Sequence, residues 1–158
     1  MNSEISTLYS LAHELLYLGM DDSPIYSDNF SRLNREIYHQ ANTLYFRRGS
    51  TPEEEAFLCL SLLMAYNATF YDSGDKQDRI QYILDRCWKV LDNLSVSPLK
   101  AHLLTYCYGE VYEDDLLKQA HAIISSWDKS SLTPEQMEIM EELKNFEDNQ
   151  YPFEELKD

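Results

Sequence analysis

One segment limits the fold of this 158-residue chain more than any other: "AFLCLSLLMAYNATFY", Ala56 to Tyr71, where almost every side chain is apolar or small. The segment is too short to span a bilayer, which takes about 20 apolar residues. It also contains the polar residues Ser61, Asn67 and Thr69. We therefore predict a helix that is buried on most of its sides at the centre of a small helical bundle.

The residues before this segment carry a clear helix-start signal. Thr51 suits the N-cap, Pro52 suits the first helical position, and Glu54 lies three residues after Thr51, as in a capping box. The negative charges of Glu53 to Glu55 also favour the positive end of the helix dipole. The acidic triplet is therefore explained by the helix start alone.

Apolar residues recur at helical spacing along most of the remaining chain. Only 4 glycines and 5 prolines interrupt it, which favours helices over many short strands. We predict about seven helices, with approximate bounds 3–18, 27–46, 52–71, 76–94, 98–109, 113–127 and 134–145. The acidic tail, residues 146–158, either packs through Phe146, Tyr151 and Phe153 or frays.

These helices predict an all-α fold in a single domain, residues 1–158. Short loops between the later helices favour antiparallel neighbours. Helix starts recur at Thr51, Ser97 and Thr133, a spacing similar to that of helical-hairpin repeats, although no repeat signature aligns across them. We favour an irregular bundle, and a repeat-like stack of helical hairpins is the alternative.

The charge of the chain restricts its partners. Its 28 acidic and 13 basic residues give a formal charge of −15, which repels the phosphates of DNA and RNA and attracts a basic protein. The N-terminal residues lack the features of a secretory signal, and we find no membrane-spanning segment. The chain has an odd number of cysteines, Cys59, Cys87 and Cys107, without the spacing of a disulfide framework, which predicts buried thiols rather than disulfides, in a reducing cytoplasm.

No motif in the sequence predicts catalysis, a metal or a cofactor. "HELLY", His13 to Tyr17, resembles the zinc-protease motif H-E-x-x-H, but Tyr17 stands where the second histidine must be. The other histidines, His39, His102 and His121, stand singly on separate predicted helices. There is no G-x-S-x-G motif, no phosphate-binding glycine loop and no Cys-x-x-Cys. We therefore predict a protein that is not an enzyme and that has no catalytic, metal or cofactor site.

A cluster of tyrosines and acids at the junction of the fifth and sixth helices is the candidate partner-binding site. Tyrosine offers a large contact area at low entropic cost, and neighbouring acids suit a basic partner. The predicted partner-binding residues are Tyr108, Glu110, Tyr112, Glu113 and Asp114. Alternatively, the tyrosines pack the two helices together and the acids start the second helix. Residues 135–158, with nine acids and two bases, are the next candidate surface.

Several long stretches of the chain resemble the UpxZ family. They are "LAHELLYLGMDDSPIYSDNFSRLN", "STPEEEAFLCLSLLMAYNATFYDSGDK", "ILDRCWKVLD" and "LLTYCYGEVYEDDLLKQAHAII". Together they extend over nearly the whole chain, which makes the resemblance far more specific than a short motif.

The resemblance implies a regulator encoded in capsular polysaccharide loci of gut bacteria. Members of the family antagonise UpxY antiterminators, which are paralogues of the elongation factor NusG. The expected partner is therefore a UpxY-type protein from another locus, bound without direct contact to nucleic acid or membrane. A generic acidic helical adapter, which scaffolds other proteins, is the alternative function.

Overall fold

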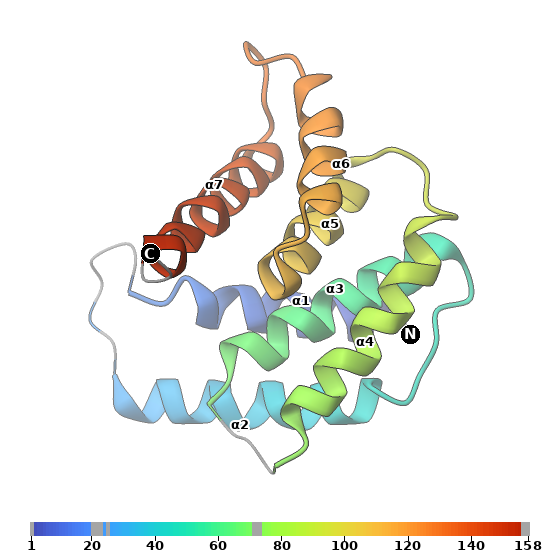
Figure 1. Ribbon diagram of the computed structural model, residues 1–158. Helices are drawn as coiled ribbons and strands as arrows, with labels where there is room; N and C mark the ends of the chain where they lie inside the picture. Colours follow the sequence, from blue (N-terminus) through green and yellow to red (C-terminus); the bar gives the residue numbers. More distant parts are fainter. Residues whose placement is uncertain (1, 20–23, 25, 71–73, 156–158) are drawn as a thin grey trace. The chain divides into compact units, whose positions relative to one another are not determined.

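The computed structural model describes residues 2–19, 24, 26–70 and 74–155, and residues 150–155 by their backbone alone. In these residues the chain forms seven helices and no strand, which confirms the predicted all-α class (Figure 1). The helices are α1 (Asn2–Leu16), α2 (Ser27–Leu44), α3 (Pro52–Ala68), α4 (Lys76–Leu91), α5 (Pro98–Val111), α6 (Asp114–Ser125) and α7 (Pro134–Glu155). Among these described helices, none is both long and apolar enough to cross a membrane.

The helices group into two compact units, Met1–Asp92 and Asn93–Asp158, which we call unit 1 and unit 2. Unit 1 contains α1 to α4, and unit 2 contains α5 to α7. The single-domain organisation and the preference for an irregular bundle stay predictions. Each unit is described separately below.

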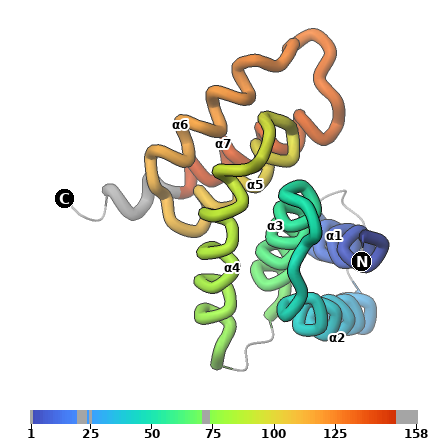
Figure 2. Tube along the Cα trace, turned by 90° about the vertical axis from the view of Figure 1, so that its right-hand side faces the viewer, coloured from blue at the N-terminus to red at the C-terminus, as the bar shows by residue number. Residues whose placement is uncertain are grey.

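Helix α3 is the centre of unit 1, where it contacts α1, α2 and α4 (Figure 2). Its side chains are buried around the whole circumference, which confirms the prediction made from its composition. The buried residues are Ala56, Leu58, Cys59, Leu60, Ser61, Leu62, Leu63, Met64, Ala65 and Tyr66. The helix ends at Ala68, earlier than predicted, because the backbone becomes extended at Thr69 (φ −93°, ψ 150°), whose hydroxyl and N–H both donate to the carbonyl of Ala65. Tyr71, the predicted end, lies outside the described residues.

The start of α3 confirms the N-cap and corrects the capping box. The hydroxyl of Thr51 accepts a hydrogen bond from the N–H of Glu54 at 3.1 Å. The carboxylate of Glu54, however, accepts from the N–H of Ser50 (2.9 Å) and from its hydroxyl (3.2 Å), one residue earlier than a capping box requires. The reciprocal pattern is complete at α7, where Thr133 and Gln136 each donate a backbone N–H to the other's side-chain oxygen.

Glu55 has a role that the sequence analysis did not foresee, because its carboxylate pairs with the buried Arg86 of α4. The guanidinium donates to both carboxylate oxygens, at 2.8 and 2.9 Å, and also to the backbone carbonyls of Tyr45 (3.2 Å) and Arg47 (2.8 Å). Gly49 adds its N–H to Glu55 at 2.9 Å. One buried ion pair therefore joins the end of α2, the following loop, the start of α3 and the middle of α4.

Only glycine fits at position 49 beside this ion pair. A Cβ atom added to Gly49 would lie 2.2 Å from the backbone nitrogen of Glu55 and 2.5 Å from its Cα. These are backbone atoms of the first turn of α3, which cannot move aside without disturbing the helix start. The close approach in turn allows the N–H of Gly49 to reach the Glu55 carboxylate.

In unit 2, α5 contacts both α6 and α7 and is itself buried along most of its length. Phe146 of α7 packs against the ring of Tyr106, with ring centroids 5.9 Å apart. Its ring also lies where a Cβ atom on Gly109 would stand, at 2.8 Å. Phe146 therefore belongs to the packing of α7 on α5.

Helix α7 continues past its predicted end near residue 145. Its backbone is helical to Glu155, so most of the predicted tail extends the helix. The last three residues of that tail, 156–158, lie outside the described residues, as do the side chains of Tyr151 and Phe153. Fraying of the tail stays a prediction.

We predict that replacing Glu55 by alanine destabilises the protein by about 3 kcal/mol, because Arg86 then remains buried without its counter-charge. Glu53 is the matched control, since it lies in the same first turn of α3 but is exposed. Its replacement by alanine should lower the stability by only about 0.5 kcal/mol, because the variant loses only the interaction of the carboxylate with the helix dipole. Urea unfolding at neutral pH measures both. Equal losses would show that the ion pair adds nothing.

The same pair predicts a dependence of stability on pH. Burial alone would raise the pKa of Glu55, but hydrogen bonds from Arg86 and Gly49 and the nearby arginine charges lower it below its ordinary value of 4.5. A carboxylate with a lowered pKa stabilises the fold above its unfolded pKa, and this contribution is lost as the pH falls through the folded pKa. The stability advantage over Glu55→Gln should therefore be complete well above the ordinary pKa of 4.5 and shrink as the pH falls below it, through the lowered folded pKa. A constant difference would contradict the assignment.

Candidate partner-binding surface

The structure brings the five residues predicted to bind a partner together at the junction of α5 and α6. Tyr108 and Glu110 lie in the last turn of α5, Tyr112 is its C-cap, Glu113 is the N-cap of α6, and Asp114 is the first residue of α6. We call these five residues the junction surface. All of them belong to unit 2.

Tyr112 makes the sharp turn between the two helices. Its backbone is in the left-handed region (φ 54°, ψ 37°), and its N–H donates to the carbonyl of Tyr108 at 2.8 Å. Glycine usually occupies such a position, because a side chain is disfavoured there by about 1 kcal/mol. The ring of Tyr112 meets the ring of Tyr108 edge to face, with centroids 5.2 Å apart. The contact with Tyr108 orients the ring of Tyr112.

The five residues differ in exposure, and this separates their roles. Tyr108 is 1% exposed and belongs to the core, as the alternative interpretation of the tyrosines predicted. Glu110 and Tyr112 are half-buried, whereas Glu113 and Asp114 are exposed. The acids also stand at the start of α6, where they favour the helix dipole. The accessible part of the junction surface is therefore one half-buried tyrosine and three carboxylates that lie within two residues of it in the chain.

A second cluster in unit 2 was not predicted from the sequence. His102 Nε2 lies 3.1 Å from Glu142 Oε2, and the hydroxyl of Tyr106 donates to Glu142 Oε1 at 3.3 Å. Glu138 lies one helical turn before Glu142 on α7 and completes the cluster. The sequence offered only a weak signal, the spacing of four residues between His102 and Tyr106 and between Glu138 and Glu142. Because these two pairs lie on different helices, the sequence did not show that they meet. His13 of "HELLY" stacks instead on Tyr17, with ring centroids 4.5 Å apart.

Unit 1 carries an exposed group of aromatic and arginine side chains that sequence reasoning also missed. Phe46 is 76% exposed and packs against Tyr45, with ring centroids 5.0 Å apart. The guanidinium of Arg79 lies 4.6 Å from the ring centroid of Tyr45, and Arg48 donates to the hydroxyl of Tyr82 at 2.6 Å. Aromatic and arginine side chains are enriched in protein interfaces, so this group is a second accessible surface of the right chemistry.

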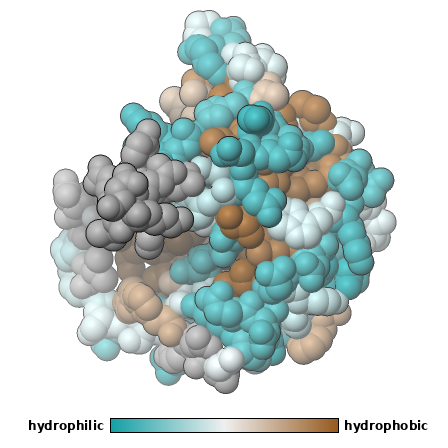
Figure 3. All heavy atoms as spheres, in the orientation of Figure 1, coloured by the Kyte–Doolittle hydropathy of each residue, from teal (hydrophilic) through white to brown (hydrophobic). Residues whose placement is uncertain are grey.

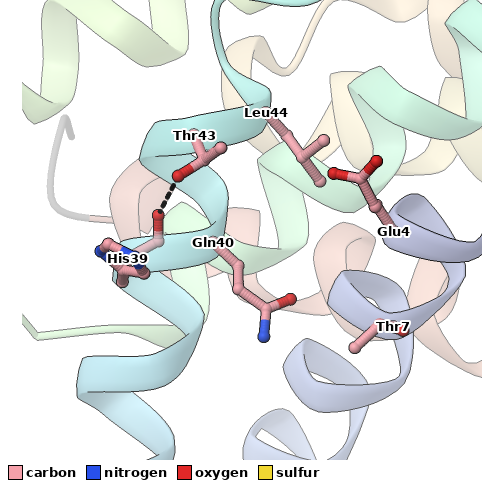
Figure 4. Close-up of a pocket in the computed structure, with 6 residues that line it drawn as sticks. All are labelled: Glu4, Thr7, His39, Gln40, Thr43 and Leu44. Carbon is pink, nitrogen blue, oxygen red and sulfur yellow. Dashed lines mark hydrogen bonds between the residues drawn. The ribbon is translucent and has the colours of Figure 1, made fainter. Parts of the chain in front are cut away.

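A pocket of about 270 Å³ lies between α1 and α2 of unit 1 (Figure 4). It is lined by Glu4, Thr7, His39, Gln40, Thr43 and Leu44. The hydroxyl of Thr7 donates to the carbonyl of Ser3, and that of Thr43 donates to the carbonyl of His39. Glu4 forms an ion pair with Arg47 at 3.1 Å. The polar groups of the pocket are thus largely used within the protein, which does not favour a ligand site.

Hydrophilic side chains cover much of the face drawn in Figure 3, with apolar residues between them. The chain also has a charge of −15, an all-α fold and a junction surface of tyrosine and carboxylate side chains. These features define an acidic all-α protein whose accessible chemistry suits binding to another protein. Comparison with known proteins specifies the class further. The chain belongs to the UpxZ family of transcription anti-terminator antagonists, whose family model matches residues 5–109.

A solved structure supports this assignment. The chain is 50% identical to a transcription anti-terminator antagonist UpxZ from Bacteroides uniformis ATCC 8492, known from a crystal structure at 1.68 Å resolution. The match covers 97% of this chain and 96% of that chain, with a TM-score of 0.88. No curated protein matches the chain significantly. The resemblance noted in the sequence is therefore confirmed.

The left-handed backbone of Tyr112 leads to a prediction about stability. Tyr112→Gly and Tyr112→Ala both remove the ring contact with Tyr108, but only glycine also relieves the backbone strain. We expect the glycine variant to be about 1 kcal/mol more stable than the alanine variant in urea unfolding. If alanine is equally stable or more stable, the left-handed cap at this position is wrong.

Proposed function

We propose that this chain inhibits NusG-like UpxY antiterminators from other capsular polysaccharide loci by binding them directly, in the bacterial cytoplasm and without catalysis. The observation that carries the proposal is membership of a family of transcription anti-terminator antagonists, matched over residues 5–109 and supported by a relative 50% identical along nearly the whole chain. An antagonist of a transcription factor needs a surface that recognises that factor. The charge of this chain makes a protein a better target than nucleic acid.

The junction surface is the proposed contact with the antiterminator. Tyr112 presents a ring whose position is set by its backbone cap and by Tyr108 beneath it, so little side-chain freedom is lost on binding. Glu113 and Asp114 are exposed beside it and suit basic residues of the partner. Tyr108 takes part by supporting Tyr112 from the core, and the half-buried Glu110 lies in the last turn of α5, two residues before Tyr112.

Charge reversal at the junction tests the proposed contact. We expect the double variant Glu113→Lys and Asp114→Lys to bind a UpxY-type protein at least about tenfold more weakly, mainly through slower association, because steering of a basic partner is lost. The effect should diminish as salt is raised, since exposed charges are screened over about 8 Å at physiological ionic strength. Surface plasmon resonance with the purified proteins measures both rates.

The matched control is the double variant Glu53→Lys and Asp78→Lys, which makes the same change in net charge at the starts of α3 and α4. Both control residues are exposed. If control and junction variants lose affinity equally, net charge decides binding and the junction is no specific contact. If the junction variant binds normally and melts normally, the contact lies elsewhere, and residues 135–158 are tested next.

The alternative function, a generic helical adapter, differs in the partners that it predicts. A specific antagonist should retain a UpxY-type protein from a different locus in a pull-down and should not retain NusG. An adapter should show no such preference. Adding the chain to a transcription reaction that depends on the same UpxY-type protein should reduce read-through, and this readout separates inhibition from binding alone.

A further inference from the structure

A buried imidazole and two carboxylates meet between α5 and α7 in unit 2. His102 is 1% exposed, Glu142 is 8% exposed and Glu138 is half-buried. One ligand atom from each of the three side chains lies within 4.8 Å of the other two. Charged groups are rarely buried unless they are paired or bind a metal ion, so this cluster calls for a physical explanation.

The helices preorganise the three side chains. Glu138 and Glu142 lie four residues apart on α7 and therefore share one face of that helix. His102 and Tyr106 are spaced in the same way on α5, and their rings lie 5.4 Å apart. Glu142 turns one oxygen to His102 Nε2, at 3.1 Å, while its other oxygen accepts from the hydroxyl of Tyr106 at 3.3 Å. Such a second hydrogen bond is how proteins orient a carboxylate that binds a metal.

The electrostatics and the donor atoms favour a cation among these groups. Two carboxylates one helical turn apart repel each other, and a divalent cation would remove that repulsion. One imidazole nitrogen and two carboxylate oxygens are donors for Zn²⁺, Mn²⁺ or Fe²⁺, whereas Ca²⁺ and Mg²⁺ prefer oxygen alone. Three protein ligands would also leave one position for water, as zinc sites with three protein ligands do.

The spacing needs only a small adjustment. Donor atoms about 2.1 Å from a tetrahedral ion lie about 3.4 Å from one another. His102 and Glu142 already satisfy this at 3.1 Å, so the outer limit of 4.8 Å leaves at most a shift of about 1.4 Å for the remaining donor. Glu138 is the least buried of the three, so its carboxylate is the one that would make that shift. Its partial exposure also gives an ion a route from solvent.

We infer that His102, Glu138 and Glu142 bind a divalent transition-metal ion, best represented by Zn²⁺, which joins α7 to α5 as a structural site. The sequence analysis predicts no metal site because His102 stands singly on its helix, and the inference departs from that prediction because the fold brings donors from α5 and α7 together. In the competing explanation, the cluster is a hydrogen-bonded polar contact between the two helices and binds no ion. The inference is independent of the proposed function, because it concerns the stability of unit 2.

The test uses the full chain, treated with a chelator and then freed of it by dialysis. Isothermal titration with Zn²⁺ should show one ion bound per chain, and a hundredfold excess over the dissociation constant should raise the melting temperature by roughly 8 °C. Co²⁺ should bind in place of Zn²⁺ and give the visible absorption of a tetrahedral site with nitrogen and oxygen ligands. Neither effect should occur with Mg²⁺.

Two variants separate this cluster from other ways of binding zinc. Glu138→Gln removes one ligand at the least buried position, so the variant should fold normally and bind Zn²⁺ at least about tenfold more weakly. His121→Gln is the control, since it removes an exposed histidine that lies 2.6 Å from Glu147 and could bind zinc at the surface. It should leave binding and the cobalt spectrum unchanged. The inference is overturned if the unaltered chain binds no Zn²⁺, if Glu138→Gln binds it equally well, or if His121→Gln abolishes binding.

Discussion

The buried ion pair between Arg86 and Glu55 is the interaction on which unit 1 most depends. Arg86 has an almost fully buried side chain, and its hydrogen bonds to Glu55, Tyr45 and Arg47 cross from α4 to other segments. Two of these contacts reach the backbone carbonyls just after α2, which have no partner within that helix. The pair therefore satisfies backbone groups at the end of α2 while it fixes the start of α3.

This fixed start matters because α3 carries no directional pattern of its own. A helix that is apolar on all sides packs equally well after a rotation about its axis, so its core contacts alone specify its orientation poorly. Glu55 accepts from Arg86 and from the N–H of Gly49, and it lies 3.7 Å from Arg48, so these directed contacts help to define that rotation. Buried ion pairs often add little net stability, and the specificity of helix orientation is the role that we assign to this one.

In unit 2, α5 has the corresponding central position and carries both candidate sites. His102 and Tyr106, in its second and third turns, face Glu142 of α7, and Tyr112, at its end, forms the junction with α6. The packing of Phe146 on Tyr106 and Gly109 lies between these two sites. Contacts that place α7 on α5 therefore also support the last turn of α5, from which the junction surface begins.

Features that depend on neighbouring residues could be predicted from the sequence, and features that depend on distant residues could not. The caps at Thr51, Ser97 and Thr133 are local, and all three accept the expected backbone hydrogen bond. Burial of α3 followed from its composition. Glu55 and Arg86 lie 31 residues apart, and His102 and Glu142 lie 40 apart, so no spacing rule joins them. Similarly, nothing in the sequence distinguishes the core residue Tyr108 from its half-buried neighbour Tyr112.

Hydrogen–deuterium exchange of the chain with and without a UpxY-type protein tests most directly whether the junction of α5 and α6 binds the antiterminator. Binding there should slow exchange of the amides from about Glu110 to Leu116, which include the N–H groups of the first turn of α6. Amides around the exposed aromatic and arginine group of unit 1 should exchange as before. Protection confined to unit 1, with the junction of α5 and α6 unchanged, would contradict the account.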